Sequence, residues 1–342
     1  MVKSKSSVRP VPELRDLLVT MTYDFKWLKT SRLLETFWDR RQRKDFFFYD
    51  IAELYHENTK LHRYAILQTA LSTDVFMKQP PIIEAATRAF KEYLHCPRVT
   101  LPQEDMTLSA RLSEVIRARR SVRHFDNQPI TLAELSKLLY YSNGITASYD
   151  FIELVSGRQM TQHLRAAPSG GALYPTEIYV AALNVTGLSP GLYHYNVREH
   201  CLETLKEVGD LATSFPNAFP VHPEIVRIDQ AAVVLVLTAV FERTMAKYGP
   251  RGYRYVMQEA GHIAQNTYLV ATACGLGAVA LAGFFDDEIN DWLGVDGVDE
   301  ATTYAIVVGH PATCQIHAAP GHDLVSVPEA EGGEEANLRG AV

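Results

Sequence analysis

Apolar residues follow two different periods along this chain. They recur at helical spacing between residues 107 and 118, between 132 and 143, and from about 254 to 273. Elsewhere they form short runs between turn residues, which is typical of buried strands. The pattern therefore predicts an α+β fold. Strands are expected at 177–183, 192–195, 201–205, 231–239, 277–281 and 303–308.

Polar residues mark where several of these helices begin and end. Thr107 is placed to cap the first helix, and Thr131 with Glu134 has the spacing of a capping box. Gly275 follows the long helix at the position where a left-handed residue commonly ends one. A further short helix is expected at 286–293, where acidic residues occupy the first turn.

The remaining segments are less regular. Residues 31–70 and 82–95 look mostly helical, with a break at Gln79-Pro80-Pro81, whereas 145–176 looks like a loop. The two prolines within 96–103 suit a linker. We therefore expect three parts: a mostly helical N-terminal region at 1–105 that offers a surface for partner docking, a domain at 106–327, and a disordered acidic tail at 328–342.

Composition narrows the class of protein. A net charge of −7 argues against nucleic acid as the main partner, because phosphate binding needs a basic surface. The longest apolar run, Ala231–Val240, is too short to span a bilayer, so no membrane segment is expected. The four cysteines show no metal-binding spacing, so no metal site is expected, and they fit a cytoplasmic protein.

Three sequence motifs carry candidate chemistry. Residues 119–123 have the sequence Arg-Arg-Ser-Val-Arg, and one arginine side chain can bind two phosphate oxygens at once. Basic residues are also common at the C-terminus of any helix. Residues 167–175 contain Gly170-Gly171, where backbone can approach a flat ligand or simply turn. Residues 275–284 form a strand of small side chains whose amides could face a ligand or pack in the core. Each motif alone is consistent with either a ligand-binding or a structural role.

Taken together, the order and spacing of these motifs resemble those of the FMN-dependent nitroreductase superfamily. Within it, APSGGALYPTEIY, KYGPRGYRY and EAGHIAQNTYL are similar to the SagB-type thiazole- and oxazole-forming peptide dehydrogenases. The resemblance is dense over residues 105–312 and extends more loosely to YHENTK at 55–60. It implies a nitroreductase-like fold with a mixed, mainly antiparallel sheet flanked by helices. It also implies a homodimer with FMN at the subunit interface.

The resemblance also assigns the cofactor contacts. It implies that the arginine motif at 119–123 contacts the FMN phosphate and ribityl chain. The glycine motif at 167–175 would lie along the flavin, and the small-residue strand at 275–284 would present its backbone to the isoalloxazine. The residues expected to bind FMN are Arg119, Ser121, Arg123, Pro168, Ser169, Gly170, Ala280, Leu281, Ala282 and Gly283.

This chain departs from the family pattern at two places. Ala172 stands where many nitroreductases carry a polar Asn. The stretch after the last predicted strand also lacks the Lys/Arg pair that often closes on the phosphate, and either Arg251 or Arg254 is a candidate replacement.

Lys247 and Tyr248 match the catalytic signature of the resembling family. A partly desolvated lysine has a lowered pKa and can act as a base, and a tyrosine hydroxyl can orient the ring or relay the proton. Without the resemblance, a surface lysine and a half-buried tyrosine would be the simpler interpretation. Glu259 and Gln265 are candidates to support the site, whereas His262 is interpreted as an ordinary helix residue.

The resulting prediction is oxidation of thiazoline or oxazoline rings, with the hydride passing to FMN N5 and the proton to Lys247. The peptide-like substrate would be either a ribosomal precursor beside a cyclodehydratase or an intermediate on a nonribosomal peptide synthetase. Two alternatives stay open. One is an NAD(P)H-dependent nitro- or quinone reductase on the same fold, and the other is a non-catalytic scaffold subunit of a biosynthetic complex.

Overall fold

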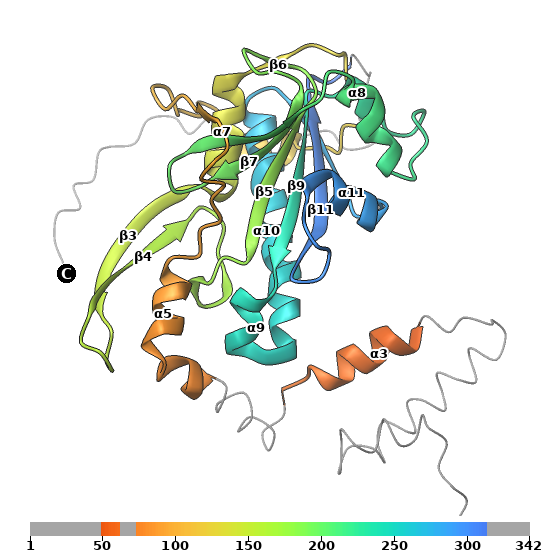
Figure 1. Ribbon diagram of the computed structural model, residues 1–342. Helices are drawn as coiled ribbons and strands as arrows, with labels where there is room; N and C mark the ends of the chain where they lie inside the picture. Colours follow the sequence, from red (N-terminus) through yellow and green to blue (C-terminus); the bar gives the residue numbers. More distant parts are fainter. Residues whose placement is uncertain (1–48, 62–72, 313–342) are drawn as a thin grey trace, which may run out of the picture.

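The computed structural model describes residues 49–61 and 73–312 of the 342-residue chain. Within these residues, seven strands form one sheet in the order β1-β8-β7-β5-β9-β11-β10, and all its neighbouring pairs are antiparallel (Figure 1). The predicted α+β fold with a mainly antiparallel sheet is confirmed. The strands are β1 (Arg98–Thr100), β5 (Thr176–Ala182), β7 (Gly191–Asn196), β8 (Cys201–Glu207), β9 (Val233–Val240), β10 (Gly277–Leu281) and β11 (Glu300–Gly309).

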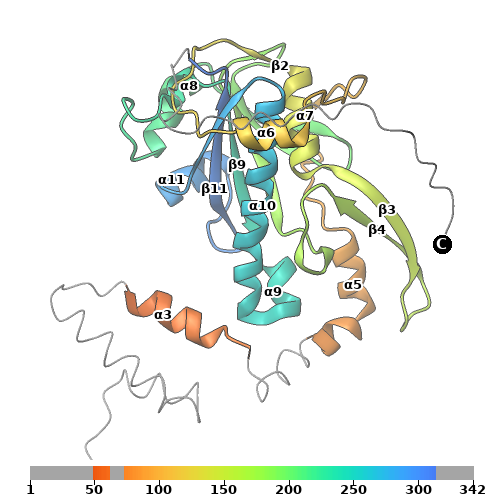
Figure 2. The same cartoon turned by 180° about the vertical axis from the view of Figure 1, so that it is seen from behind.

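The central strands are apolar at nearly every position because helices cover both faces of the sheet (Figures 1 and 2). In β5, Ile178 and Val180 join the core beneath α7 and α10, whereas Tyr179 and Ala181 join the core beneath α8 and α11. Each fully buried aliphatic side chain of this kind stabilises the fold by about 1.5–3 kcal/mol. The helices of these layers are α6 (Leu112–Ala118), α7 (Leu132–Asn143), α8 (Leu211–Ser214), α10 (Gly252–Ala273) and α11 (Asp286–Leu293).

Several predicted helix ends are confirmed. Thr131 and Glu134 form the expected capping box at the start of α7. Gly275 has a φ of 75° just beyond α10, as a left-handed helix-ending residue should. Thr107 does not cap its helix, because α6 begins at Leu112 and Thr107 hydrogen bonds to Asp105 instead.

The expectation of a loop at 145–176 was wrong for most of that span. Strands β3 (Ile145–Ile152) and β4 (Gln159–Arg165) form an antiparallel hairpin that projects away from the main sheet (Figure 1). Most of β3 is exposed. A strand that buries neither face has no apolar stripe, so its sequence lacks the alternation from which strands are recognised. A short parallel pair, β2 (Ile130–Thr131) with β6 (Val185–Thr186), completes the strands in the described residues.

The segment before the main sheet also differs from expectation. Pro80 and Pro81, expected to break a helix, form the first turn of α5 (Pro80–Thr87), where a missing N–H costs nothing. This helix ends at Thr87 and does not continue to 95. The expected linker at 96–103 contains β1, which pairs with β8.

Only part of the predicted N-terminal helical region falls within the described residues. There the chain forms α3 (Tyr49–Asn58). The remainder of the 31–70 prediction and the predicted tail at 328–342 lie outside the described residues. Over residues 49–61 and 73–312, no helix combines the length and apolar character needed to cross a membrane.

Candidate active site

The glycine loop, residues 167–175, connects the hairpin to β5 and holds an unusual backbone conformation. Gly171, Ala172 and Tyr174 have φ values of 70°, 53° and 44°. A left-handed conformation costs a residue with a side chain about 1–2 kcal/mol. Such strain persists where the surroundings hold it, commonly at functional sites. Ala172, which departs from the polar residue of the resembling family, occupies one of these strained positions.

Side chains beneath the loop hold it in place. The Ser169 hydroxyl accepts a hydrogen bond from the Tyr174 backbone N–H at 2.9 Å and donates to Glu259. Glu259 lies on α10, and its carboxylate also accepts from the Thr176 backbone N–H at 3.3 Å. Burial raises the pKa of Glu259, and these hydrogen bonds oppose the shift. Glu259 is therefore a support of the loop, and the hydroxyl of Ser169 is already committed to the protein.

Lys247 and Tyr248, here called the Lys-Tyr pair, lie directly against this loop. They end α9 (Glu242–Tyr248), the helix that precedes α10. A β-carbon built on Gly171 would lie 2.6 Å from the Tyr248 Oη and 3.1 Å from the Lys247 Nζ. A side chain at position 171 would therefore displace the ends of the Lys247 and Tyr248 side chains. The structure thus brings together two segments that the sequence separates by about 75 residues.

Lys247 is half-buried and lies among aromatic rings. Its Nζ lies 5.3 Å from the centre of the Phe76 ring and 5.4 Å from that of Tyr248. In the described part of the chain, no carboxylate forms an ion pair with Lys247. Burial lowers the pKa of Lys247, as expected from the sequence. Such an amine can accept a proton.

Tyr248 is held edge-on to a second tyrosine. Its ring meets that of Tyr255 at 5.0 Å between centroids and an interplanar angle of 86°. Burial raises the pKa of Tyr248, and the neighbouring Tyr255 raises it further. The hydroxyl therefore stays protonated at neutral pH and can donate a hydrogen bond. Tyr255 also contacts the glycine loop, since its side chain lies 3.5 Å from the β-carbon position of Gly170.

The arginine segment, Arg119–Arg123, lies alongside β10. The Val122 N–H donates to the Ala278 carbonyl at 2.9 Å, and Ser121 bridges the same residue in parallel register. A β-carbon on Gly277 would lie 2.6 Å from Val122, so this close approach also depends on glycine. The arginine segment and the small-residue strand β10 are therefore neighbours in space.

Tyr268, which the sequence analysis did not single out, contacts both the arginine segment and β10. Its hydroxyl accepts a hydrogen bond from the Ala280 N–H at 2.7 Å and lies 3.4 Å from the Ser121 Oγ. The Arg119 guanidinium sits 5.3 Å from the centre of the Tyr268 ring. The backbone N–H of Ala280, expected to face a cofactor, is thus occupied by a tyrosine. Nothing in the helical pattern around residue 268 marks it.

A cavity of about 580 Å³ opens beside the arginine segment. Arg120, Ser121 and Arg123 line one side of it, and Pro311 with Ala312, which follow β11, line the other. No acidic residue is among its lining residues, and a pocket of this size is large enough for a cofactor-sized ligand. The donor set fits a phosphate group.

A model of the nitroreductase family matches residues 116–310, more than half of the chain. The chain belongs to the nitroreductase family. The match begins within α6, just before the arginine segment, and ends after β11. It therefore covers every segment of the candidate site in the described residues except Phe76.

Three curated relatives and one solved structure extend this comparison. MJ1384 of Methanocaldococcus jannaschii, named as a nitroreductase, is 39% identical over 187 residues, which are 54% of this chain and 84% of MJ1384. The trifolitoxin-processing protein TfxB of Rhizobium leguminosarum bv. trifolii is 34% identical over 43% of this chain and 40% of TfxB. The microcin B17-processing protein McbC of Escherichia coli is 32% identical over 39% of this chain and 49% of McbC.

This chain therefore spans less than half the length of the two processing proteins. A crystal structure from Anabaena variabilis, described as a nitroreductase, shares 29% identity with a TM-score of 0.56. It covers 75% of this chain and 46% of the other.

Within this nitroreductase-family chain, the candidate site falls into two groups at opposite ends of α10. The glycine loop and the Lys-Tyr pair lie near Tyr255, whereas the arginine segment and β10 lie near Tyr268. Thirteen residues separate the two tyrosines on α10, which is about 20 Å at the rise of an α-helix. Within one chain the two groups are therefore separated along α10.

The expectation that Arg251 or Arg254 replaces a phosphate contact finds no support in this arrangement. Both lie at the Lys-Tyr end of α10 and bind the C-terminal end of α3. Arg251 donates to the Thr59 carbonyl at 2.6 Å, and Arg254 donates to the His56 carbonyl at 2.6 Å. Gln265, expected to support the site, is exposed on α10.

Proposed function

We propose that this chain is an FMN-dependent dehydrogenase that oxidises thiazoline or oxazoline rings in a peptide-like substrate to thiazole or oxazole. The observation that carries the proposal is the Lys-Tyr pair, half-buried and placed on Gly171 of the glycine loop. Relatives named for trifolitoxin and microcin B17 processing support a peptide substrate.

The residues of the pair suit the reaction. Aromatising the ring removes a proton from one ring carbon and a hydride from its neighbour. FMN, when bound, supplies the acceptor for the hydride at its N5. Lys247, whose pKa is lowered by burial, takes the proton, and the protonated hydroxyl of Tyr248 hydrogen bonds to the substrate and holds the ring in place.

The residues present also fit FMN itself. Arg119, Ser121 and Arg123 are the proposed contacts of the phosphate and ribityl chain. Ser121 and Arg123 line the cavity, whose lining carries no acidic side chain, whereas the Arg119 guanidinium lies over the Tyr268 ring. Ala280 to Gly283 are proposed to lie along the ring system, with Leu281 paired to Ala305 of β11 and Ala282 and Gly283 offering backbone beyond the end of β10. Pro168, Ser169 and Gly170 would approach the flavin through backbone atoms.

A homodimer is part of this proposal. The two groups of cofactor-binding residues lie about 20 Å apart along α10, so one chain does not complete the site. In a two-fold dimer, the arginine segment of one subunit can face the glycine loop of the other. The site would then be shared, with two equivalent copies per dimer.

Turnover of a defined substrate tests the proposal. The full chain, reconstituted with FMN, is incubated in air with a short peptide that carries one thiazoline, and mass spectrometry follows the loss of two hydrogens. We expect conversion to the thiazole without added nicotinamide. An unchanged peptide, with flavin that NADPH reduces rapidly, would instead identify a nitro- or quinone reductase, the function that the similarity to MJ1384 favours.

A further inference from the structure

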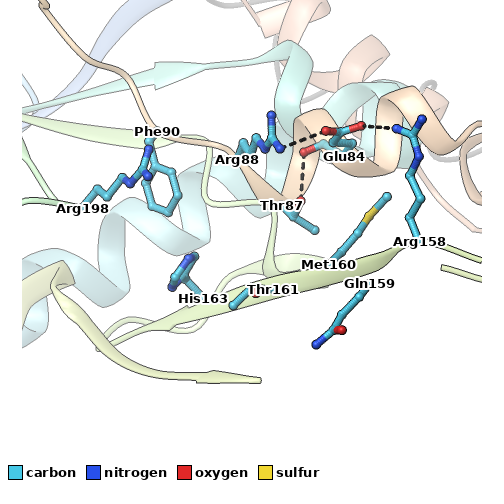
Figure 3. Close-up of a pocket in the computed structure, with 10 residues that line it drawn as sticks. All are labelled: Glu84, Thr87, Arg88, Phe90, Arg158, Gln159, Met160, Thr161, His163 and Arg198. Atoms are coloured by element: carbon cyan, nitrogen blue, oxygen red, sulfur yellow. Dashed lines mark hydrogen bonds and ion pairs between the residues drawn. The ribbon is translucent and has the colours of Figure 1, made fainter. Parts of the chain in front are cut away.

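A second groove, of about 460 Å³, lies between α5 and strand β4 (Figure 3). Helix α5 contributes Glu84, and Arg88 follows directly after it. The hairpin contributes four consecutive residues, 158–161, and Arg198 comes from the turn between β7 and β8. None of these residues belongs to the cofactor site proposed above.

The groove runs along an edge of β4. Successive residues of a strand point to opposite faces, so a surface lined by four consecutive residues follows the backbone edge. The other edge of β4 pairs with β3, and in the described residues no further strand pairs with β4. A strand edge of this kind offers backbone N–H and C=O groups to an added extended segment.

The side chains around this edge are predominantly basic. Glu84 bridges Arg88 at 3.0 Å and Arg158 at 3.4 Å, as Figure 3 shows. Arg198 is 3.5 Å from Glu92 and 3.7 Å from Glu199, neither of which lines the groove. The lining thus holds three guanidinium groups and one carboxylate. Each guanidinium carries five N–H donors, so these ion pairs leave donors available for an anionic ligand.

One residue that lines the groove belongs to an apolar cluster that also contacts the Lys-Tyr pair. Met160 lines the groove and packs in one apolar cluster with Phe76 and Tyr248. The Phe76 ring in turn lies 5.3 Å from the Lys247 Nζ. Met160 and Phe76 are buried, so this cluster is packed core that adjoins both the groove and the Lys-Tyr pair.

We propose that this groove binds an acidic segment of the peptide substrate as an additional strand along β4. Carboxylates of the segment would pair with Arg88, Arg158 and Arg198, while its backbone bonds to the free edge. The azoline would lie elsewhere in the same peptide, beyond the segment held in the groove. The role in substrate delivery rests on the proposed function, but the binding itself does not.

Fluorescence anisotropy tests this binding with the full chain and a labelled peptide of alternating Glu and Thr. We expect this peptide to bind, its Gln-for-Glu counterpart to bind about tenfold more weakly, and N-methylation of alternate backbone amides to abolish binding in one of the two registers. Arg158→Glu should weaken binding of the acidic peptide about tenfold. Arg111→Glu is the matched control, since Arg111 is exposed at the start of α6.

Equal affinity for the Glu and Gln peptides, or an Arg158→Glu variant as tight as Arg111→Glu, would overturn the inference. So would a groove covered by a second copy of the chain, seen in sedimentation as an oligomer that only Arg158→Glu dissociates. The peptides carry no azoline, so their binding is independent of turnover. Binding without thiazoline oxidation would contradict the proposed function alone, and oxidation without binding would contradict this inference alone.

Discussion

Gly171 determines how closely the glycine loop approaches the Lys-Tyr pair. Its φ of 70° favours glycine, and a side chain here would lie 2.6 Å from the Tyr248 Oη. Gly157, in the β3–β4 turn, has a similar φ of 67° but nothing within 4 Å of its β-carbon position. The two glycines therefore separate the backbone requirement from the steric one.

Gly171→Ala should impair catalysis much more than stability. Left-handed strain costs either alanine variant about 1–2 kcal/mol of unfolding free energy, measured by denaturant titration. Only the alanine at 171 also displaces the Lys-Tyr pair, so its kcat should fall about 100-fold while Gly157→Ala retains the wild-type rate. Equal rates for the two variants would show that the loop does not position the pair.

At the scale of elements, helix α10 separates the two halves of the site and also receives α3. The C-terminal carbonyls of α3 are bound by Arg251 and Arg254, and Tyr55 packs edge-on against Tyr253 at 5.5 Å. These contacts place the N-terminal helix beside the turn that carries the Lys-Tyr pair. Cationic side chains at a helix C-terminus satisfy carbonyls that have no partner within the helix.

Arg254→Ala should loosen α3 without unfolding the sheet. Hydrogen bonds from a charged donor contribute about 1.5–3 kcal/mol, so amide exchange in residues 52–60 should accelerate while β5 and β9 remain protected. Arg117→Ala, an exposed arginine of α6, is the control. Unchanged exchange in residues 52–60 would mean that α3 is held by other contacts.

Burial explains how much of the elements could be predicted. Strand β9, apolar at nearly every position, and helices α7, α10 and α11 were predicted nearly to their ends. The exposed hairpin was not, because solvent on both sides of β3 imposes no apolar pattern. Within the site, short sequence motifs were enough to propose Arg119 and Gly170 as cofactor contacts. The contact of Gly171 with Tyr248 and the bridging role of Tyr268 depend on tertiary packing, which spacing does not encode.

At the scale of the whole molecule, we propose that two copies of the chain share each site, because its two groups are separated along α10. Each active centre would take its arginine segment from one subunit and its Lys-Tyr pair from the other. Subunit complementation can therefore detect the arrangement without a structure of the dimer.

Mixing two inactive variants should restore activity. One carries Lys247→Ala, and the other carries Arg119→Ala with Arg123→Ala and should bind less flavin. After dissociation and random reassociation, half of the dimers are mixed and each has one intact site, which gives about a quarter of the wild-type activity. Lys247→Ala mixed with Tyr248→Phe is the control, because both changes affect the same half of a site and no recovery above the Tyr248→Phe level is expected. No recovery in the first mixture would place the complete site within one chain.

The measurement that tests the central claim most directly is anaerobic mixing of the FMN-loaded chain with a thiazoline peptide, followed by flavin absorbance and by product mass. The account predicts that the wild type loses its oxidised flavin spectrum as one thiazole forms per flavin. It predicts that Lys247→Ala, with equal flavin content, does so about 10²–10⁴-fold more slowly, because the proton has lost its acceptor. Flavin reduction at the wild-type rate in Lys247→Ala, or no reduction by the thiazoline in the wild type, would contradict it.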